Sequence, residues 1–163
     1  MTEYDYCQNL AERFDPDRYL CSLFAPVIVR QELMTLYAFN IEVAGIRESV
    51  SEPLIGRMRL QWWIDIMDRV FAGDPPAHQV AIALSKTIKK FGLEREKFDA
   101  MLNARTADFE DTPFSSIEDL EKYAEMTSAA LASQALKILG QTGDIVQSAG
   151  RSIGVAWALT GLL

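Results

Sequence analysis

The chain has 163 residues, of which 49% are hydrophobic and 24% are charged, and its formal net charge at pH 7 is −7. This length suits one domain with a sizeable core, and the composition is globular, which excludes a disordered or fibrous class. Lys and Arg form no dense run, so the basic surface that nucleic-acid-binding proteins use is missing. We therefore expect no nucleic-acid partner.

The two cysteines, Cys7 and Cys21, do not form a CxxC pair. Neither a disulfide framework nor a zinc site is therefore indicated, and a reducing compartment is the simplest interpretation. The first residues lack the basic and apolar regions of a signal peptide. The longest mostly apolar stretch, Ser152–Leu163, is shorter than the roughly 20 residues of a membrane-spanning helix. These features predict a cytoplasmic location without a transmembrane segment.

Apolar residues recur at helical spacing along almost the whole chain, and no segment shows the sustained alternation of a β-strand. The predicted fold class is therefore all-α. We expect helices at Glu3–Phe14, Arg18–Phe24, Val27–Arg47, from Ser51-Glu52-Pro53 to the stop at Gly73-Asp74-Pro75-Pro76, Gln79–Phe91, Glu94–Phe109, Ile117–Leu139 and Ile145–Leu163.

Residues that typically begin or end helices support several of these helix bounds. Asp15-Pro16-Asp17 breaks the first helix and caps the second, because proline cannot continue a helix and aspartate accepts from its first amides. Gly92 is expected to cap the Gln79–Phe91 helix at its C-terminal end. Ser115-Ser116-Ile117-Glu118 matches a capping box, in which the serine hydroxyl and the glutamate three residues later satisfy each other's backbone donors.

The last segment, Ile145–Leu163, has almost no polar face. A helix that is apolar on nearly all sides is a buried helix, and such a helix seldom ends a natural chain without a cap or a polar tail. Two interpretations follow. The chain is a fragment of a longer protein, or its last helix docks against the bundle or against a second copy.

Two segments are distinctive, Leu36-Tyr37-Ala38-Phe39-Asn40 and Met58-Arg59-Leu60-Gln61-Trp62-Trp63. With Asp17-Arg18-Tyr19-Leu20 and Val50-Ser51-Glu52-Pro53 they resemble the squalene/phytoene synthase family, most closely its branch of proteins related to mitochondrial complex I assembly factors. The resemblance continues weakly to Tyr123 and into Gly154–Leu163. It implies a single helical domain over residues 1–163, a helical bundle with the isoprenoid synthase fold that is truncated relative to the longer family domain.

Family synthases join two prenyl diphosphates and carry two aspartate-rich motifs that hold Mg²⁺ against the leaving diphosphate. Two aspartates four residues apart share one helical face and can share a metal. The resemblance places the first motif on Ala44 and Glu48, and alanine cannot ligate a metal. Glu42 lies about 200° from Ala44 around a helix and is a poor substitute. The second motif falls on Leu159-Thr160-Gly161-Leu162-Leu163, which contains no acid.

The leading hypothesis is therefore a family member with degenerate motifs and a non-catalytic binding or assembly role, by resemblance in respiratory complex assembly and peripheral at the inner membrane. Under this hypothesis we expect no cofactor and no metal in this chain. The alternative is a prenyltransferase of isoprenoid biosynthesis, with Mg²⁺ as cofactor, Glu48 as candidate metal ligand, and Glu48 and Tyr123 as candidate catalytic residues. A third hypothesis is a structural helical module that forms homo-oligomers through its terminal helix.

Polar residues gather between two otherwise apolar helices, and two interpretations stay open for them. They form buried or half-buried salt bridges that join the helices, since unpaired charge in such a place is costly, or their arginines contact an anionic ligand such as a prenyl diphosphate or a lipid headgroup. Asn40 either hydrogen-bonds inside the bundle or binds substrate, and the two tryptophans either pack at the core and edge or line an apolar cavity. The polar group is Arg47, Glu48, Glu52, Arg57, Arg59 and Gln61, and the candidate ligand-binding residues are Tyr37, Asn40, Arg47, Arg57, Arg59, Gln61 and Trp62.

Other polar residues are interpreted as solvated. Asp108, Glu110 and Asp111 cluster near a helix end and are expected to form a solvated turn. His78, the only histidine, falls in a proline-rich loop, and we expect no catalytic role for it.

Overall fold

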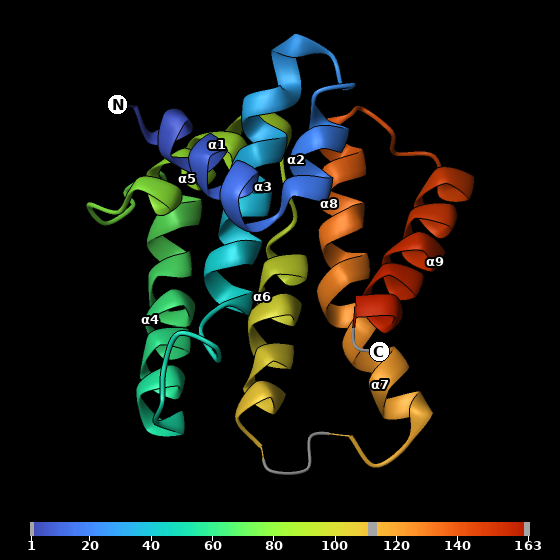
Figure 1. Cartoon of the computed structure of the whole chain (residues 1–163). Coiled ribbons are helices and arrows are strands. Elements are labelled where there is room, and N and C mark those ends of the chain that lie inside the picture. Colours follow the sequence, from blue (N-terminus) through green and yellow to red (C-terminus); the bar gives the residue numbers. More distant parts are fainter. Residues whose placement is uncertain (1, 111–113, 162–163) are drawn as a thin grey trace. The chain divides into compact units, whose positions relative to one another are not determined.

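The computed structural model describes residues 2–110 and 114–161, and Figure 1 shows the course of the chain. All regular structure in these residues is helical, which confirms the all-α prediction. The helices are α1 Glu3–Phe14, α2 Pro16–Ser22, α3 Val27–Ala44, α4 Pro53–Ala72, α5 Gln79–Phe91, α6 Arg95–Ala104, α7 Ile117–Ala124, α8 Ala130–Ile138 and α9 Asp144–Gly161, with a 3₁₀ turn η1 at Arg105–Phe109 and a π turn η2 at Glu125–Ala129.

Several predicted helix ends are confirmed. The bounds of α1 and α5 are those expected from the sequence. Asp15 caps α2 by accepting from the amide of Arg18, and Pro16 occupies the first helical position. Gly92 ends α5 with φ at 60°, in the left-handed region that glycine adopts without steric cost.

Other ends differ from the prediction. Helix α3 stops at Ala44 rather than Arg47, and residues 45–49 form a turn. The predicted Ser115–Glu118 capping box is wrong by one residue, because Ser116 has the extended backbone of an N-cap and accepts from the amide of Asp119 at 3.1 Å. The hydroxyl of Ser115 instead donates to the Asp119 carboxylate at 2.6 Å.

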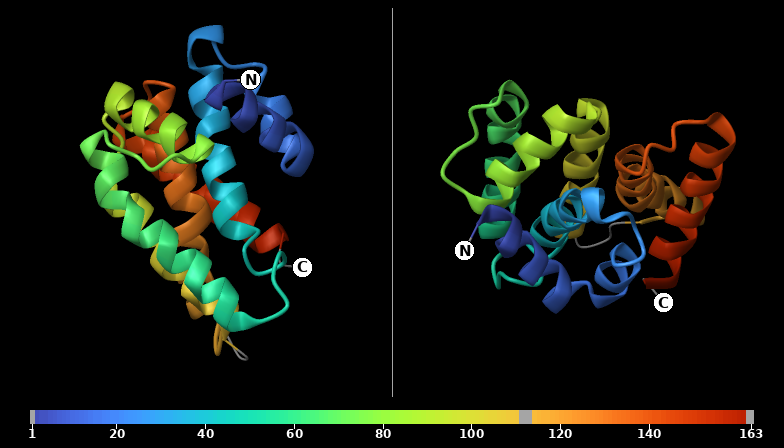
Figure 2. Two further views of the ribbon diagram at one scale, coloured as in Figure 1. Left: turned by 90° about the vertical axis from the view of Figure 1, so that its left-hand side faces the viewer. Right: turned by 90° about the horizontal axis from the view of Figure 1, so that it is seen from above.

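The chain divides into two compact units, Met1–Gly45 with Asp65–Leu93 and Ile46–Ile64 with Glu94–Leu163. In the first unit α1 packs against α2, α3 and α5, as Figure 2 shows. Its core is built from the apolar faces of these helices, which bury Cys7, Leu36 and Leu84 completely.

In the second unit α6 packs against η2 and α8, and α9 packs against α7, η2 and α8. The close approach of α9 depends on small residues, because Gly150 and Gly154 are its buried positions. A Cβ at Gly154 would lie 2.5 Å from the Cα of Ala129, so only glycine fits at this contact.

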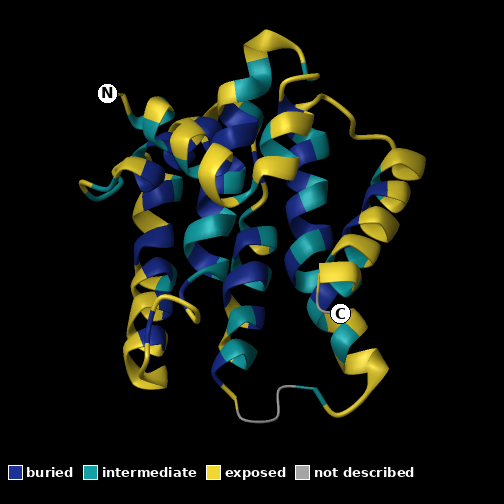
Figure 3. Cartoon of the chain, in the orientation of Figure 1, coloured by how far each residue is buried: buried dark blue, intermediate teal, exposed yellow. Residues whose placement is uncertain are grey.

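The exposure of α9 corrects the prediction of a helix buried on all sides. Ile145 is 87% exposed, Ile153 is 65% exposed and Trp157 is 45% exposed. Figure 3 shows this side of α9 as exposed. The neighbouring helices of this unit cover only part of the apolar surface of α9. The apolar pattern of the sequence therefore predicted more burial than the described residues show.

Replacing Gly154 with alanine is expected to destabilise the protein by about 1–3 kcal/mol, although alanine is the better helix former. The added methyl group would meet the backbone of Ala129 and Ser128, which cannot move aside as a side chain can. Urea denaturation measures the loss, with Gly143→Ala as the control, because a Cβ at Gly143 meets nothing within 4 Å. Equal stability of the two variants would contradict the close packing of α9.

Candidate functional site

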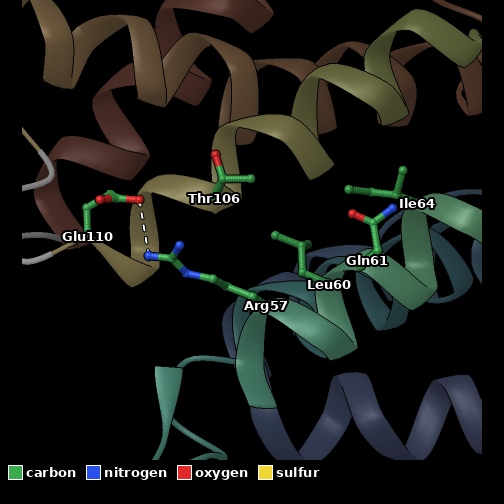
Figure 4. A pocket seen from close by; sticks show the side chains of 6 residues that line it. All are labelled: Arg57, Leu60, Gln61, Ile64, Thr106 and Glu110. Carbon is green, nitrogen blue, oxygen red and sulfur yellow. Dashed lines mark hydrogen bonds and ion pairs between the residues drawn. The ribbon is translucent and has the colours of Figure 1, made fainter. Parts of the chain in front are cut away.

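A cavity in the second unit contains two of the predicted ligand-binding residues. It lies between α4 and the chain segment of η1 and Glu110, and it has a volume of about 200 Å³. In Figure 4, Arg57 and Glu110 point toward each other at one end, and Gln61 and Ile64 lie at the other. Positions on α4 spaced by three and four residues share one face, which is why this helix supplies most of the lining. The lining residues are Arg57, Leu60, Gln61, Ile64, Thr106 and Glu110.

The guanidinium of Arg57 already has partners at the mouth of this cavity. Its Nη2 lies 3.3 Å from Oε1 of Glu110 and donates to the carbonyl oxygen of Phe109 at 3.1 Å. Both charged side chains are more than half exposed, so water weakens the pair. An anionic ligand at this end would have to compete with the Glu110 carboxylate.

Gly56 allows η1 to approach α4 so closely. A Cβ at Gly56 would lie 2.2 Å from Cε1 of Phe109, and the Phe109 ring is buried at this contact. The sequence analysis missed both residues. The signal that could have found Gly56 is an isolated glycine in the first turn of a helix, which marks a place where another segment packs closely.

The interpretation of the polar group as buried salt bridges is wrong. Arg59 donates to the hydroxyl of Ser49 at 3.0 Å, and Arg47 and Glu48 belong to the exposed turn after α3. The early end of α3 explains this, since it places the turn at the protein surface instead of on a helix face. All six members are exposed, namely Arg47, Glu48, Glu52, Arg57, Arg59 and Gln61.

The two tryptophans divide as the packing interpretation expects. Trp63 is buried in the core, whereas Trp62 is 38% exposed. Their rings meet edge to face, with centroids 5.2 Å apart and planes at 77°. This geometry suits aromatic pairs and lets Trp62 cover the outer side of Trp63.

Tyr37 and Asn40 belong to the first unit, where both are half-buried on α3. The Arg18 guanidinium lies 5.8 Å from the centre of the Tyr37 ring and pairs with Asp15 at 2.6 Å. Burial raises the pKa of Tyr37, so its hydroxyl keeps its proton at neutral pH. The predicted ligand-binding residues are therefore distributed over both units.

The residues at the first aspartate-rich motif do not fit a Mg²⁺ site. Ala44 has no donor atom and is the last residue of α3. Glu48 lies in the exposed turn beyond it, not one helical turn further along the same face. Among residues 2–110 and 114–161, no three His, Cys, Asp or Glu side chains are grouped as a metal site requires. The donor set is therefore unsuited to the metal that the family resemblance implies.

Glu42 and His78 form a contact in the first unit that the sequence analysis missed. Oε2 of Glu42 lies 3.4 Å from Nε2 of His78, and Nδ1 of His78 accepts from the amide of Ala81 at the start of α5. Because Nδ1 accepts, the proton of the neutral ring is on Nε2, facing Glu42. Burial raises the pKa of Glu42 to about 7 and lowers the pKa of His78. Both shifts favour the neutral form of each group, so burial opposes a full ion pair at this contact.

Tyr123 joins η1 to α7. Its hydroxyl donates to Oδ1 of Asp108 at 2.5 Å and accepts from Nη1 of Arg105 at 2.8 Å, while Arg105 also pairs with Asp108. Burial, with the neighbouring Asp108 carboxylate, raises the pKa of Tyr123 far above its ordinary value. The solvated-turn interpretation is therefore wrong for Asp108, while Asp111 lies outside the described residues.

Comparison with known proteins decides the family. The sequence model of the family described as squalene/phytoene synthase matches residues 11–163. The chain belongs to this family. Within it, the chain is 36% identical over 151 residues to NADH dehydrogenase (ubiquinone) complex I, assembly factor 6 of Bos taurus, covering 93% of this chain and 45% of that protein. It is 22% identical over 166 residues to phytoene synthase 1, chloroplastic, of Zea mays, covering 98% of this chain and 40% of that protein.

The fold agrees with this family. The squalene synthase HpnC from Alicyclobacillus acidocaldarius superposes with a TM-score of 0.83 at 22% identity, covering 94% of this chain and 57% of that chain. This likeness confirms the predicted isoprenoid synthase fold. The chain spans about half the length of the curated relatives it matches. Within its described residues, no helix combines the length and the apolar character that crossing a bilayer requires.

Glu42→Gln is expected to remove a pH dependence of stability. The pKa of Glu42 is about 7 in the folded chain and near its ordinary 4.5 after unfolding, so the folded chain binds one more proton between these values. This contribution is present below about pH 4.5 and is lost as the pH rises through about 7. Relative to the parent, the variant should therefore gain on the order of 1–3 kcal/mol between pH 5 and pH 8.

Urea denaturation at a series of pH values measures this difference. Both chains keep His78, but its titration is coupled to Glu42 through their contact, so the difference between the two profiles reports the Glu42–His78 pair. Glu12→Gln, at an exposed position of α1, is the control for a general loss of negative charge. A parallel pH profile for parent and Glu42→Gln would contradict the burial of this carboxyl.

Tyr123→Phe is expected to destabilise the protein by about 1–2 kcal/mol, because it removes the hydroxyl between Asp108 and Arg105 while keeping the ring. A double-mutant cycle with Asp108→Asn, followed by chemical denaturation, measures the coupling. The double variant should lose less than the sum of the single losses. Additive losses would show that the Tyr123 hydroxyl and Asp108 act independently.

Proposed function

We propose that this chain is the binding part of a non-catalytic factor in the assembly of respiratory complex I. The observation that carries the proposal is the 36% identity, over 93% of the chain, to a protein named as a complex I assembly factor. Identity to the maize phytoene synthase is 22%. Because the chain spans about half of these relatives, the proposed role belongs to the whole protein, to which this chain contributes a helical surface.

The chemistry of the described residues supports binding over condensation. Release of diphosphate needs a metal held by several carboxylates, and the motif position offers Ala44 and an exposed Glu48 in a turn. The cavity beside α4 has about 200 Å³, below the roughly 300–1,000 Å³ of typical small-molecule sites. Its arginine already contacts Glu110. Neither the first motif position nor the cavity beside α4 suits a pair of long prenyl diphosphates.

The alternative function is prenyl transfer, and the fold shared with squalene synthases favours it. A fold by itself does not determine a reaction, because one fold serves several chemistries. Prenyl transfer would require Glu48 to act together with acids that this chain does not supply at the second motif. We regard it as the weaker proposal for that reason.

A deletion strain of the source organism tests the proposal. We expect NADH:ubiquinone oxidoreductase activity and assembled complex I to fall several-fold, with succinate oxidation and isoprenoid products unchanged. The full-length gene should restore the complex, and so should its Glu48→Ala variant, because a non-catalytic factor does not need that carboxylate. Native gels, membrane respiration assays and mass spectrometry of isoprenoids measure these outcomes.

Two results would overturn the assembly role. One is the loss of an isoprenoid product with complex I intact. The other is Mg²⁺-dependent release of diphosphate from a prenyl diphosphate by the full-length protein, abolished by Glu48→Ala. Either result would support the prenyltransferase alternative.

A further inference from the structure

The turn between α2 and α3 presents an unusual apolar surface. Residues 19–29 carry no charged side chain and are bracketed by Arg18 and Arg30. Phe24 is 92% exposed, and Val27 and Ile28 are 75% and 76% exposed. Side chains of this kind normally lie in a core, so their joint exposure marks an interaction surface. We call the exposed set the apolar tip, and its members are Leu20, Leu23, Phe24, Val27 and Ile28.

The backbone of the tip is held by hydrogen bonds. The amide of Phe24 donates to the carbonyl of Cys21, and the amide of Ala25 donates to the carbonyl of Ser22, both at 3.1 Å. Nε of Arg30 donates to the carbonyl of Ala25 at 2.8 Å. The tip therefore has its shape before it meets a partner, and docking orders little additional chain. Satisfied backbone groups also lower the cost of moving the turn into an apolar medium.

The form of the tip favours a lipid surface over a protein pocket. In Figures 1 and 2, the first turn of α3 projects beyond α1 and α5 of the same unit. A projecting apolar turn needs no complementary cavity when it enters the fluid boundary of a bilayer. No Asp, Glu, Lys, Arg or His lies between Arg18 and Arg30, so no charged side chain of this stretch would have to lose its hydration.

The charges near the tip fit this assignment. Arg18 pairs with Asp15 at 2.6 Å, and Lys90 pairs with Glu32 at 2.5 Å, so these charges are balanced. The guanidinium of Arg30 donates to the carbonyl oxygen of Ala25 and therefore lies beside the tip, and a long arginine side chain can keep its charge at lipid phosphates while its stem contacts apolar groups. The chain carries a net charge of −7, so attraction to anionic lipid cannot drive the contact. Burial of apolar side chains must do so.

We propose that the apolar tip of the α2–α3 turn inserts into the surface of a lipid bilayer and holds the chain there as a peripheral protein, with Arg30 at the headgroups. The tip belongs entirely to the first unit. The proposal is independent of the assembly role, because vesicle binding by the purified chain is measured without any respiratory complex. Each proposal can therefore fail alone.

The chain provides its own probe site. Cys21 is exposed at the end of α2, next to residues of the apolar tip, whereas Cys7 is buried and its thiol has a pKa raised by burial to about 12. A thiol-reactive, polarity-sensitive dye should therefore label Cys21 selectively, since the thiolate is the reactive form. On adding phosphatidylcholine vesicles containing phosphatidylglycerol, we expect a blue shift that persists in about 0.5 M NaCl, where electrostatic attraction is screened. No shift, or a shift abolished by salt, would overturn the proposal.

Flotation of the unlabelled chain with the same vesicles tests the residues. Phe24→Glu should lower the partition coefficient about tenfold or more, because it removes an aromatic side chain that would be buried in the bilayer and adds a charge. Ile145→Glu is the matched control, since Ile145 is 87% exposed on α9, and it should leave binding unchanged. Circular dichroism checks that both variants fold, as substitutions at exposed positions should.

Three outcomes would overturn the assignment to lipid. Phe24→Glu could bind vesicles as well as the parent does. Ile145→Glu could lose binding to the same extent, which would indicate a non-specific apolar effect. Analytical ultracentrifugation without lipid could find a dimer that Phe24→Glu dissociates, which would assign the tip to self-association.

Discussion

The candidate site depends on one steric constraint, the absence of a side chain at Gly56. The ring of Phe109 occupies the space that a Cβ would need, and this brings η1 against the first turns of α4. Arg57 follows directly in the sequence and thereby reaches the carbonyl of Phe109 and the carboxylate of Glu110. Gly154 acts in the same way at α9, where it meets the backbone of Ala129. Close helix packing at glycine thus determines which polar side chains of the second unit meet.

These polar side chains form hydrogen bonds that join elements of the second unit. Tyr123, Asp108 and Arg105 bind one another between η1 and α7. Gln134 is buried and accepts from the amide of Glu94, which fixes the start of α6 against α8. Within the described part of the chain, every buried side-chain nitrogen and oxygen has a hydrogen-bond partner. Groups that are satisfied in this way stabilise the bundle and are not held ready for a substrate.

The fold is that of the squalene/phytoene synthase family, whereas the residues at the position to which the resemblance assigns the first motif do not fit a metal site. Ala44 ends α3, and Glu48 lies in an exposed turn. The apolar surface has also been placed outside the core, at the α2–α3 turn and along one side of α9. Exposed apolar surface of this kind is suited to contact with other molecules.

The all-α class, the family and the helix ends at Asp15, Pro16 and Gly92 could be predicted from the sequence alone. These ends depend on backbone sterics and capping within a few residues, so local sequence is sufficient. The folded chain alone reveals that Arg57 meets Glu110, 53 residues away, and that Glu42 meets His78. It also shows that α9 is covered on one side. Burial and pairing depend on which distant segments pack nearby. An apolar pattern predicts that a helix face is buried, but it does not identify the segment that covers this face.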